Sequence, residues 1–367
     1  MSTAPPTYNS ANPGSPNAGG HIRAFSRFVL AAVFFIVASA VAHRAALGLV
    51  SRDWVPYVEQ AMLVFLLVVC YASFGFVLDR QSHPVGEQGL AIRKGWVGEV
   101  GMGVAFGWAI AVVCVLPLVV FGGIALRFSF AAASFGWLMA DAGFFAMATL
   151  ALQIAFRGYP LQVAIRAVGE WPAVLMLSVL AGIFQAWLPG ASHASMAVSI
   201  TLALLLSMAY LRTRALWLPW GIQFGWLASR ALLFGLPVNG MTNHSPVVQG
   251  DPVSALSLAG YDFGLDGSWF ACIVLLAAMP FVYRATRDLS FEYNAPALIP
   301  GGIPVDMDAA ARAQHESATR PEVPEVKPLV QILPAAPLAP LPLAPDLDLP
   351  RNTTPSPFPD GTSFSEK

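Results

Sequence analysis

Long apolar stretches separated by short polar segments dominate the chain between residues 24 and 284. A helix of about 20 apolar residues is long enough to cross the hydrocarbon core of a bilayer. Inside lipid such stretches must be helical, because an open strand edge would leave backbone groups without hydrogen-bond partners. The pattern therefore predicts about eight transmembrane helices, at residues 24–50, 57–78, 96–121, 128–152, 171–188, 194–211, 216–236 and 268–284.

Both ends of the chain lack this pattern. Residues 1–20 are small, polar or proline, and they have neither the basic nor the apolar region of a signal peptide. Half of the 30 prolines fall after residue 288, where acidic side chains outnumber basic ones. Such compositions favour disorder and polyproline II conformation over a packed core. The sequence thus predicts a disordered arm (1–20), a membrane domain (21–287) and a disordered, acidic, Pro-rich tail (288–367).

Composition supports a membrane protein. Of 367 residues, 56% are hydrophobic and 11% are charged, whereas soluble domains carry about 25% charged residues. The fold class expected is therefore an all-α, polytopic helical bundle. The lipid bilayer is expected to surround it as a partner. The formal net charge of −1 excludes a nucleic-acid-binding protein that works by phosphate neutralisation. The three cysteines lie in apolar stretches without a CxxC or Cys/His cluster, so no metal, no other cofactor and no disulfide framework is expected.

The Lys and Arg residues predict the orientation of the bundle. With the N-terminus inside, the inner segments collect eleven of these residues and the outer ones only three, Arg44, Arg52 and Arg127. The long outer loop at 237–267 contains acidic residues but no Lys or Arg. Because basic residues are enriched in cytoplasmic loops, both termini are expected in the cytoplasm.

One part of the chain carries a family resemblance. FRGY at 156–159, AYLRTRALWLPWGI at 209–222 and FGLPVNG at 234–240 stand where helix-flanking signatures occur in the CPBP family. This chain resembles that family of intramembrane proteases, which includes CAAX prenyl endopeptidases and bacteriocin-processing proteins. The resemblance covers about residues 150–285, and it implies a helical membrane fold, a peptide or membrane-protein partner and a bacterial plasma membrane location.

The resemblance also implies three catalytic motifs, and this chain departs from each of them. The family has a Glu-Glu pair followed by Arg, a Phe followed by His, and a His followed by Asn. Aligned on Arg157, the retained motif residue, and on Phe184, the substituted positions are Leu152, Gln153, Leu188, Gln223 and Leu227.

These substitutions remove the chemistry that the family is thought to use. A general base must exchange a proton near neutral pH, which Leu and Gln side chains do not do. Leucine also provides neither oxyanion donors nor metal ligands. The sequence therefore favours a catalytically inactive pseudoprotease that serves as a membrane scaffold or binding protein. Two alternatives stay open: an active CAAX-type endopeptidase that uses other residues, and a small-molecule or lipid carrier.

Several polar residues lie within the predicted spans. Arg157 is expected either to hydrogen-bond helix-end carbonyls or to anchor its helix at the headgroups. Ionisable residues inside the membrane are costly and usually paired or functional, which makes Asp141 and Arg230 a candidate polar pair. The glutamines near the former catalytic site are expected to bridge helices by hydrogen bonds; they are Gln153, Gln185 and Gln223.

Overall fold

A computed structural model describes residues 18–81, 83–93, 95–121, 124–239, 247–252 and 264–289. The predicted arm lies outside these residues except for its last three, which belong to the first helix. The predicted tail also lies outside them, apart from its first two residues. The helices and strands are α1 (Ala18–Leu49), α2 (Val55–Asp79), α3 (Trp96–Val120), β1 (Ile124–Phe128), α4 (Ala132–Arg157), α5 (Tyr159–Val168), α6 (Glu170–Ala186), α7 (His193–Thr213), α8 (Trp217–Ala228), β2 (Val248–Pro252) and α9 (Trp269–Ala285).

Every predicted span coincides with a helix, but not every helix is long enough to cross a bilayer by itself. Five helical segments are both long and apolar enough: 19–49, 52–79, 96–120, 132–168 and 193–213. Helices α6 and α9 have 17 residues each. Helix α8 has 12 residues and continues into a π-helical turn, η3 (Ser229–Leu233). The structure therefore supports a polytopic membrane protein with five candidate spans among the described residues, and the eight predicted spans are not confirmed.

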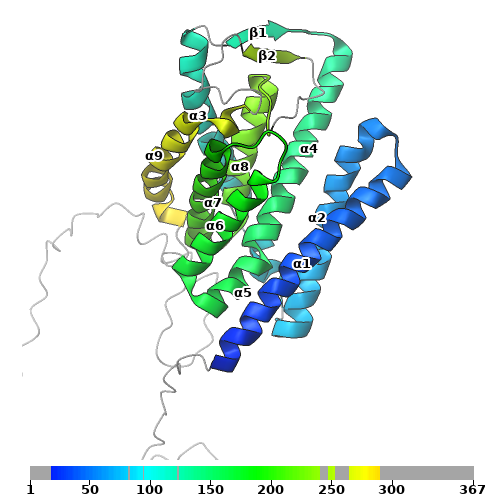
Figure 1. The fold of residues 1–367 in the computed structure, drawn as a ribbon, viewed down its shortest axis with the longest axis vertical. Helices are drawn as coiled ribbons and strands as arrows, with labels where there is room; N and C mark the ends of the chain where they lie inside the picture. Colours follow the sequence, from blue (N-terminus) through cyan, green and yellow to red (C-terminus); the bar gives the residue numbers. More distant parts are fainter. Residues whose placement is uncertain are drawn as a thin grey trace, which may run out of the picture. The chain divides into compact units, whose positions relative to one another are not determined.

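The prediction of a purely helical fold is wrong in one place. Strands β1 and β2 form an antiparallel pair in which Ile124 lies opposite Pro252 and Phe128 lies opposite Val248. The Ser129 N–H extends this ladder by donating to the Val247 carbonyl at 3.0 Å. The pair joins the α3–α4 connection to the segment before α9, two parts of the chain that are far apart in sequence (Figure 1).

Helix α5 was not predicted, and glycines set its limits. Gly158 ends α4, where its N–H donates to the carbonyls of Gln153 and Ile154 at 3.1 and 3.2 Å. Pro160 follows in the first turn of α5, where a missing N–H costs nothing. Gly169, at φ +91°, separates α5 from α6, and a positive φ is favourable mainly for glycine.

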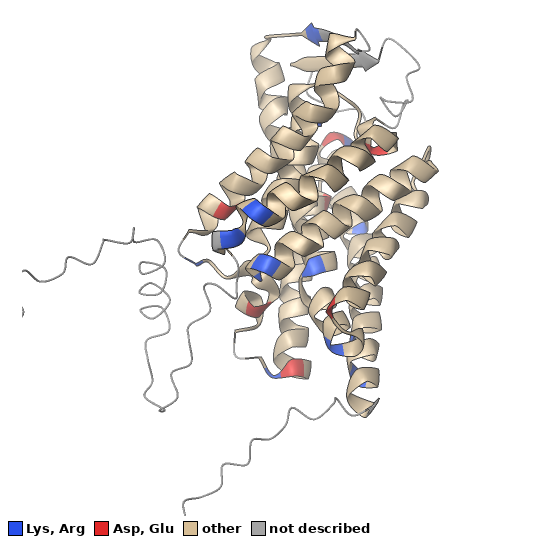
Figure 2. Cartoon of the chain, turned by 90° about the vertical axis from the view of Figure 1, so that its left-hand side faces the viewer, with Lys and Arg blue, Asp and Glu red and all other residues tan. Residues whose placement is uncertain are grey.

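The helices pack as a bundle whose outer surface is apolar. Helix α1 packs on α2 and α5, α3 on α8, and α7 on both α6 and α9. Helix α1 begins far from the two strands and α9 runs away from them (Figure 1). On α1 and α2, Ile36, Phe65 and Phe76 are each about two-thirds exposed, which is unfavourable in water but not in lipid. Among the described residues, most Arg residues lie in the part of the bundle away from the strands (Figure 2).

Helices α3 and α8 approach so closely that glycines form their interface. Gly103 and Gly107 lie one turn apart on α3, opposite Gly221 and Gly225 on α8. A Cβ atom built on Gly107 would lie 2.2 Å from the Ile222 carbonyl oxygen and 2.5 Å from the Trp226 backbone nitrogen. Small residues spaced four apart let membrane helices approach at backbone distance. This glycine interface fixes α8, and with it Gln223, relative to the rest of the bundle.

Candidate functional site: a cavity at the end of helix α4

The end of α4 brings two of the predicted residues to one buried face. Gln153 and Arg157 are four residues apart, so their side chains lie above one another on the same side of the helix. Gln153 is fully buried and Arg157 is 5% exposed. Arg157 is therefore not a headgroup anchor. Its Nη2 donates to the carbonyl oxygen of Ala203, in the middle of α7, at 3.2 Å.

Two hydrogen bonds between amide side chains join segments that are distant in sequence. Gln153 Nε2 donates to Gln223 Oε1 at 2.6 Å, which links α4 to α8, and also reaches the Pro219 carbonyl at 3.3 Å. Gln185 Nε2 donates to Asn239 Oδ1 at 2.6 Å, which links α6 to the segment after η3. All three predicted glutamines thus bond across elements.

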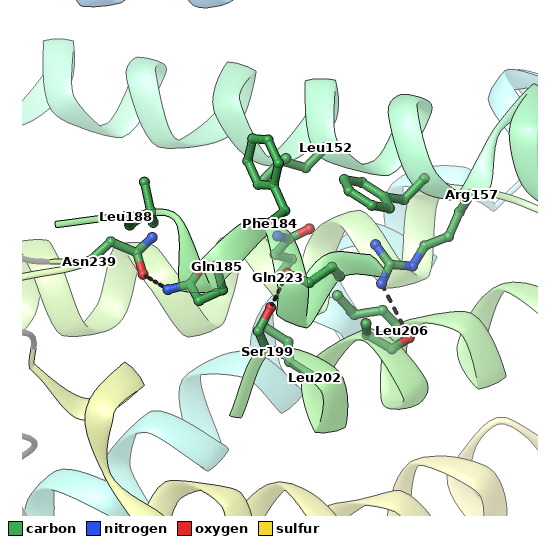
Figure 3. Close-up of a pocket in the computed structure, with 13 residues that line it drawn as sticks. Leu152, Arg157, Phe184, Gln185, Leu188, Ser199, Leu202, Leu206, Gln223 and Asn239 are labelled. Carbon is green, nitrogen blue, oxygen red and sulfur yellow. Dashed lines mark hydrogen bonds between the residues drawn. The ribbon is translucent and has the colours of Figure 1, made fainter. Parts of the chain in front are cut away.

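A cavity of about 140 Å³ lies among α4, α6, α7 and α8. Figure 3 shows the Arg157 side chain extending from α4 toward α7, with Gln223 and Phe184 nearby. Three of the five substituted motif positions line this cavity, and Gln153 is bonded to one of them. Leu227 lies one turn beyond Gln223 and does not line it. The lining residues are Leu152, Phe156, Arg157, Ala181, Phe184, Gln185, Leu188, Ser199, Leu202, Ala203, Leu206, Gln223 and Asn239.

The cavity offers hydrogen-bond donors but no side chain suited to proton transfer near neutral pH. None of the described lining residues is Asp, Glu, His or Cys. No group of three or more His, Cys, Asp or Glu within the described ranges could hold a metal ion. The guanidinium of Arg157 and the amides of Gln185, Gln223 and Asn239 can bind and orient a polar group. They cannot activate a water molecule as a general base.

The predicted pair of Asp141 and Arg230 has different partners in the structure. Asp141 Oδ1 accepts a hydrogen bond from the Tyr57 hydroxyl at 2.7 Å. Arg230 is fully buried, and its Nη1 lies 3.0 Å from Asp266 Oδ1. Its guanidinium carbon also stacks 4.0 Å from the centre of the Trp226 ring. The sequence analysis paired Asp141 with Arg230 because both are ionisable residues in predicted spans. It missed Asp266, which lies just before α9 and is only 6% exposed.

Sequence reasoning missed two residues that line the cavity and the counter-ion of Arg230. Ser199 lines the cavity from α7, while Asn239 completes it from a turn in which its own φ is +50°. Asp266 was assigned to an outer loop, but it is only 6% exposed. Nothing in the spacing of these residues distinguishes them from ordinary loop or helix positions. The available sequence signal was that Asn239 is followed by Gly240, because an Asn-Gly pair marks a turn.

Comparisons of the chain with protein-family models, with curated proteins and with solved structures found no match. The resemblance to the CPBP family therefore rests on the motif residues alone. The structure contributes an independent fact, which is that most of the substituted positions gather around one cavity. The family assignment stays a proposal.

Proposed function

We propose that this protein is a membrane-embedded binding protein of CPBP type, an inactive pseudoprotease that retains a cavity but no hydrolytic groups. The observation that carries the proposal is the lining of the cavity. Leu152, Leu188 and Gln223 stand where the family resemblance implies Glu, His and His, and they surround the same small space as Arg157. Losing even one member of a catalytic group typically costs orders of magnitude in rate.

The alternatives have less support. An active endopeptidase would need a base elsewhere in the membrane domain, and Asp141 and His193 are the first candidates. The carrier alternative would use the polar residues Asp141 and Arg230 of the membrane domain, and it loses support because Arg230 already has Asp266 as counter-ion. We therefore keep the non-hydrolytic binding protein as the proposal and the protease as its competitor.

A peptidase assay decides between these two functions. The full-length protein, purified in detergent, is expected to cleave neither prenylated nor unprenylated peptides above the background of a mock purification. The reason is the absence of a general base among the described residues that line the cavity. Reproducible cleavage that D141N or H193A abolishes, while the exposed-surface variant R44Q retains it, would overturn the proposal.

We further propose that both termini face the cytoplasm of a bacterial cell. Single cysteines at Gln249 on β2 and at Arg287 after α9 test this orientation, because both positions are exposed. The three natural cysteines, Cys70, Cys114 and Cys272, are first replaced by alanine. A membrane-impermeant maleimide is expected to label position 249 in intact cells and position 287 only after permeabilisation. The reverse pattern would contradict the orientation.

A further inference from the structure

Arg157 is a buried cation without a counter-ion among the described residues. It is 5% exposed, and no acidic side chain in the described parts of the chain forms an ion pair with it. A guanidinium has five N–H donors, but the structure provides one acceptor, the Ala203 carbonyl. The Nε atom is buried and has no hydrogen-bond partner. An unpaired buried charge is costly, so an anion bound in the adjoining cavity would supply the missing counter-charge and the missing hydrogen-bond acceptors.

The remaining lining is mostly apolar. Leu152, Phe156, Leu202 and Leu206 are among its walls. Besides Arg157, the polar side chains are three amides, which can solvate a carboxylate without adding charge, and Ser199, whose hydroxyl already donates to the Ala181 carbonyl at 3.2 Å. A ligand that matches this lining carries one negative charge at one end and an apolar group at the other.

We propose that this cavity binds a small monocarboxylic acid with an apolar chain, whose carboxylate pairs with Arg157. The inference rests on the proposed binding function and names its ligand class. A carboxylate accepts two parallel N–H bonds from a guanidinium, which is a favourable geometry for an Arg side chain. A phosphate monoester carries about 1.5 to 2 negative charges near neutral pH, which the single cation of this cavity does not balance.

The size of the cavity limits the ligand. A dry cavity of about 150 Å³ holds benzene, so the 140 Å³ available here accommodates a group of roughly six carbons. Phe184 is 44% exposed and its ring centre lies 6.2 Å from that of Phe35 on α1. A somewhat longer chain would pass Phe184 and continue along the apolar surface beside α1. Octanoate is therefore the probe of choice.

The test measures saturable binding of labelled octanoate to the full-length protein in lipid nanodiscs, with empty nanodiscs to subtract partitioning. Unlabelled octanoate is expected to displace the label. Methyl octanoate, which is uncharged, is expected to compete at least about tenfold more weakly, since a charge-assisted hydrogen bond contributes about 1.5–3 kcal/mol. Octyl phosphate is also expected to compete more weakly than octanoate, because the single cation of the cavity does not balance its additional negative charge.

Variants locate the site. R157Q, which removes the charge, is expected to weaken octanoate binding at least about tenfold, by the same energetic reasoning. A181L, which fills the cavity from α6, is also expected to weaken binding, because its larger side chain occupies the space of the ligand's apolar chain. The matched control R44Q changes an exposed arginine on α1 and is expected to bind like wild type. If R157Q fails to fold, A181L and the competitor series still decide the question.

Each outcome has a distinct meaning. Equal competition by the acid and its methyl ester, or wild-type binding by folded A181L, would overturn the carboxylate site. Stronger competition by octyl phosphate would assign the cavity to a phosphate ligand instead. A protein that cleaves no peptide and binds no octanoate saturably overturns this inference alone, whereas peptide cleavage overturns the proposed function whatever the octanoate result.

Discussion

Replacing Asp266 by alanine is expected to destabilise the protein by about 3–5 kcal/mol, since breaking a buried ion pair leaves an uncompensated charge. Arg230 would then be fully buried beside Trp226 with no counter-ion. Neither Arg230 Nη atom forms a hydrogen bond with good geometry even in the intact protein, so none of the described residues offers an acceptor that could replace the carboxylate. The measurement is the free energy of unfolding in detergent.

A second variant distinguishes the charge from the packing. Replacing both partners, as R230M/D266A, is expected to recover most of the loss, because apolar replacements of a buried pair are often neutral. The control is E170A, which breaks the exposed pair of Arg214 and Glu170 at 3.4 Å. Exposed pairs contribute at most about 1 kcal/mol. A loss for D266A no larger than that for E170A would show that the buried pair contributes little.

Replacing Gly107 by alanine is expected to cost about 3 kcal/mol or more, the upper part of the range for overpacked interiors. The added methyl group would lie 2.2 Å from the Ile222 carbonyl oxygen and 2.5 Å from the Trp226 nitrogen. Both atoms belong to the backbone of α8, so no side chain can turn aside to make room. The two helices must separate, and the cavity wall carried by α8 must move with them.

Gly101 on the same helix provides a matched control. A Cβ atom built there meets nothing within 4 Å, and alanine is the better helix former by about 1 kcal/mol. G101A is therefore expected to be neutral or stabilising in thermal unfolding of the purified protein. Equal unfolding temperatures for G107A and G101A would contradict the close contact between α3 and α8.

The helices were predictable because lipid leaves the backbone few alternatives. A long apolar stretch that must satisfy its own N–H and C=O groups forms a helix whatever its neighbours do. The pairing of β1 with β2 was not predictable in this way. It depends on two five-residue segments from distant connections meeting at one end of the bundle, and neither segment shows an alternating pattern by itself.

The candidate site was partly predictable for a different reason. Gln153 and Arg157 share a helical face by spacing alone, so their joint burial follows from local geometry. The bond between Gln153 and Gln223 depends on how α4 and α8 pack, which only the family resemblance suggested. The partner of Arg230 was assigned wrongly because only ionisable residues within the predicted spans were considered as partners. Asp266 lies in the turn before α9, and it is nevertheless buried and paired with Arg230.

The glycine interface between α3 and α8 also has a consequence for biosynthesis. Gly107 is made more than a hundred residues before Gly221, and at about 5–20 residues per second the ribosome needs several seconds to cover that distance. During this interval α3 has crossed into the membrane while the helix that fills its glycine face has not been synthesised. The close contact, and with it the cavity wall that carries Gln223, therefore forms only after the insertion of α3 and belongs to a late step of assembly.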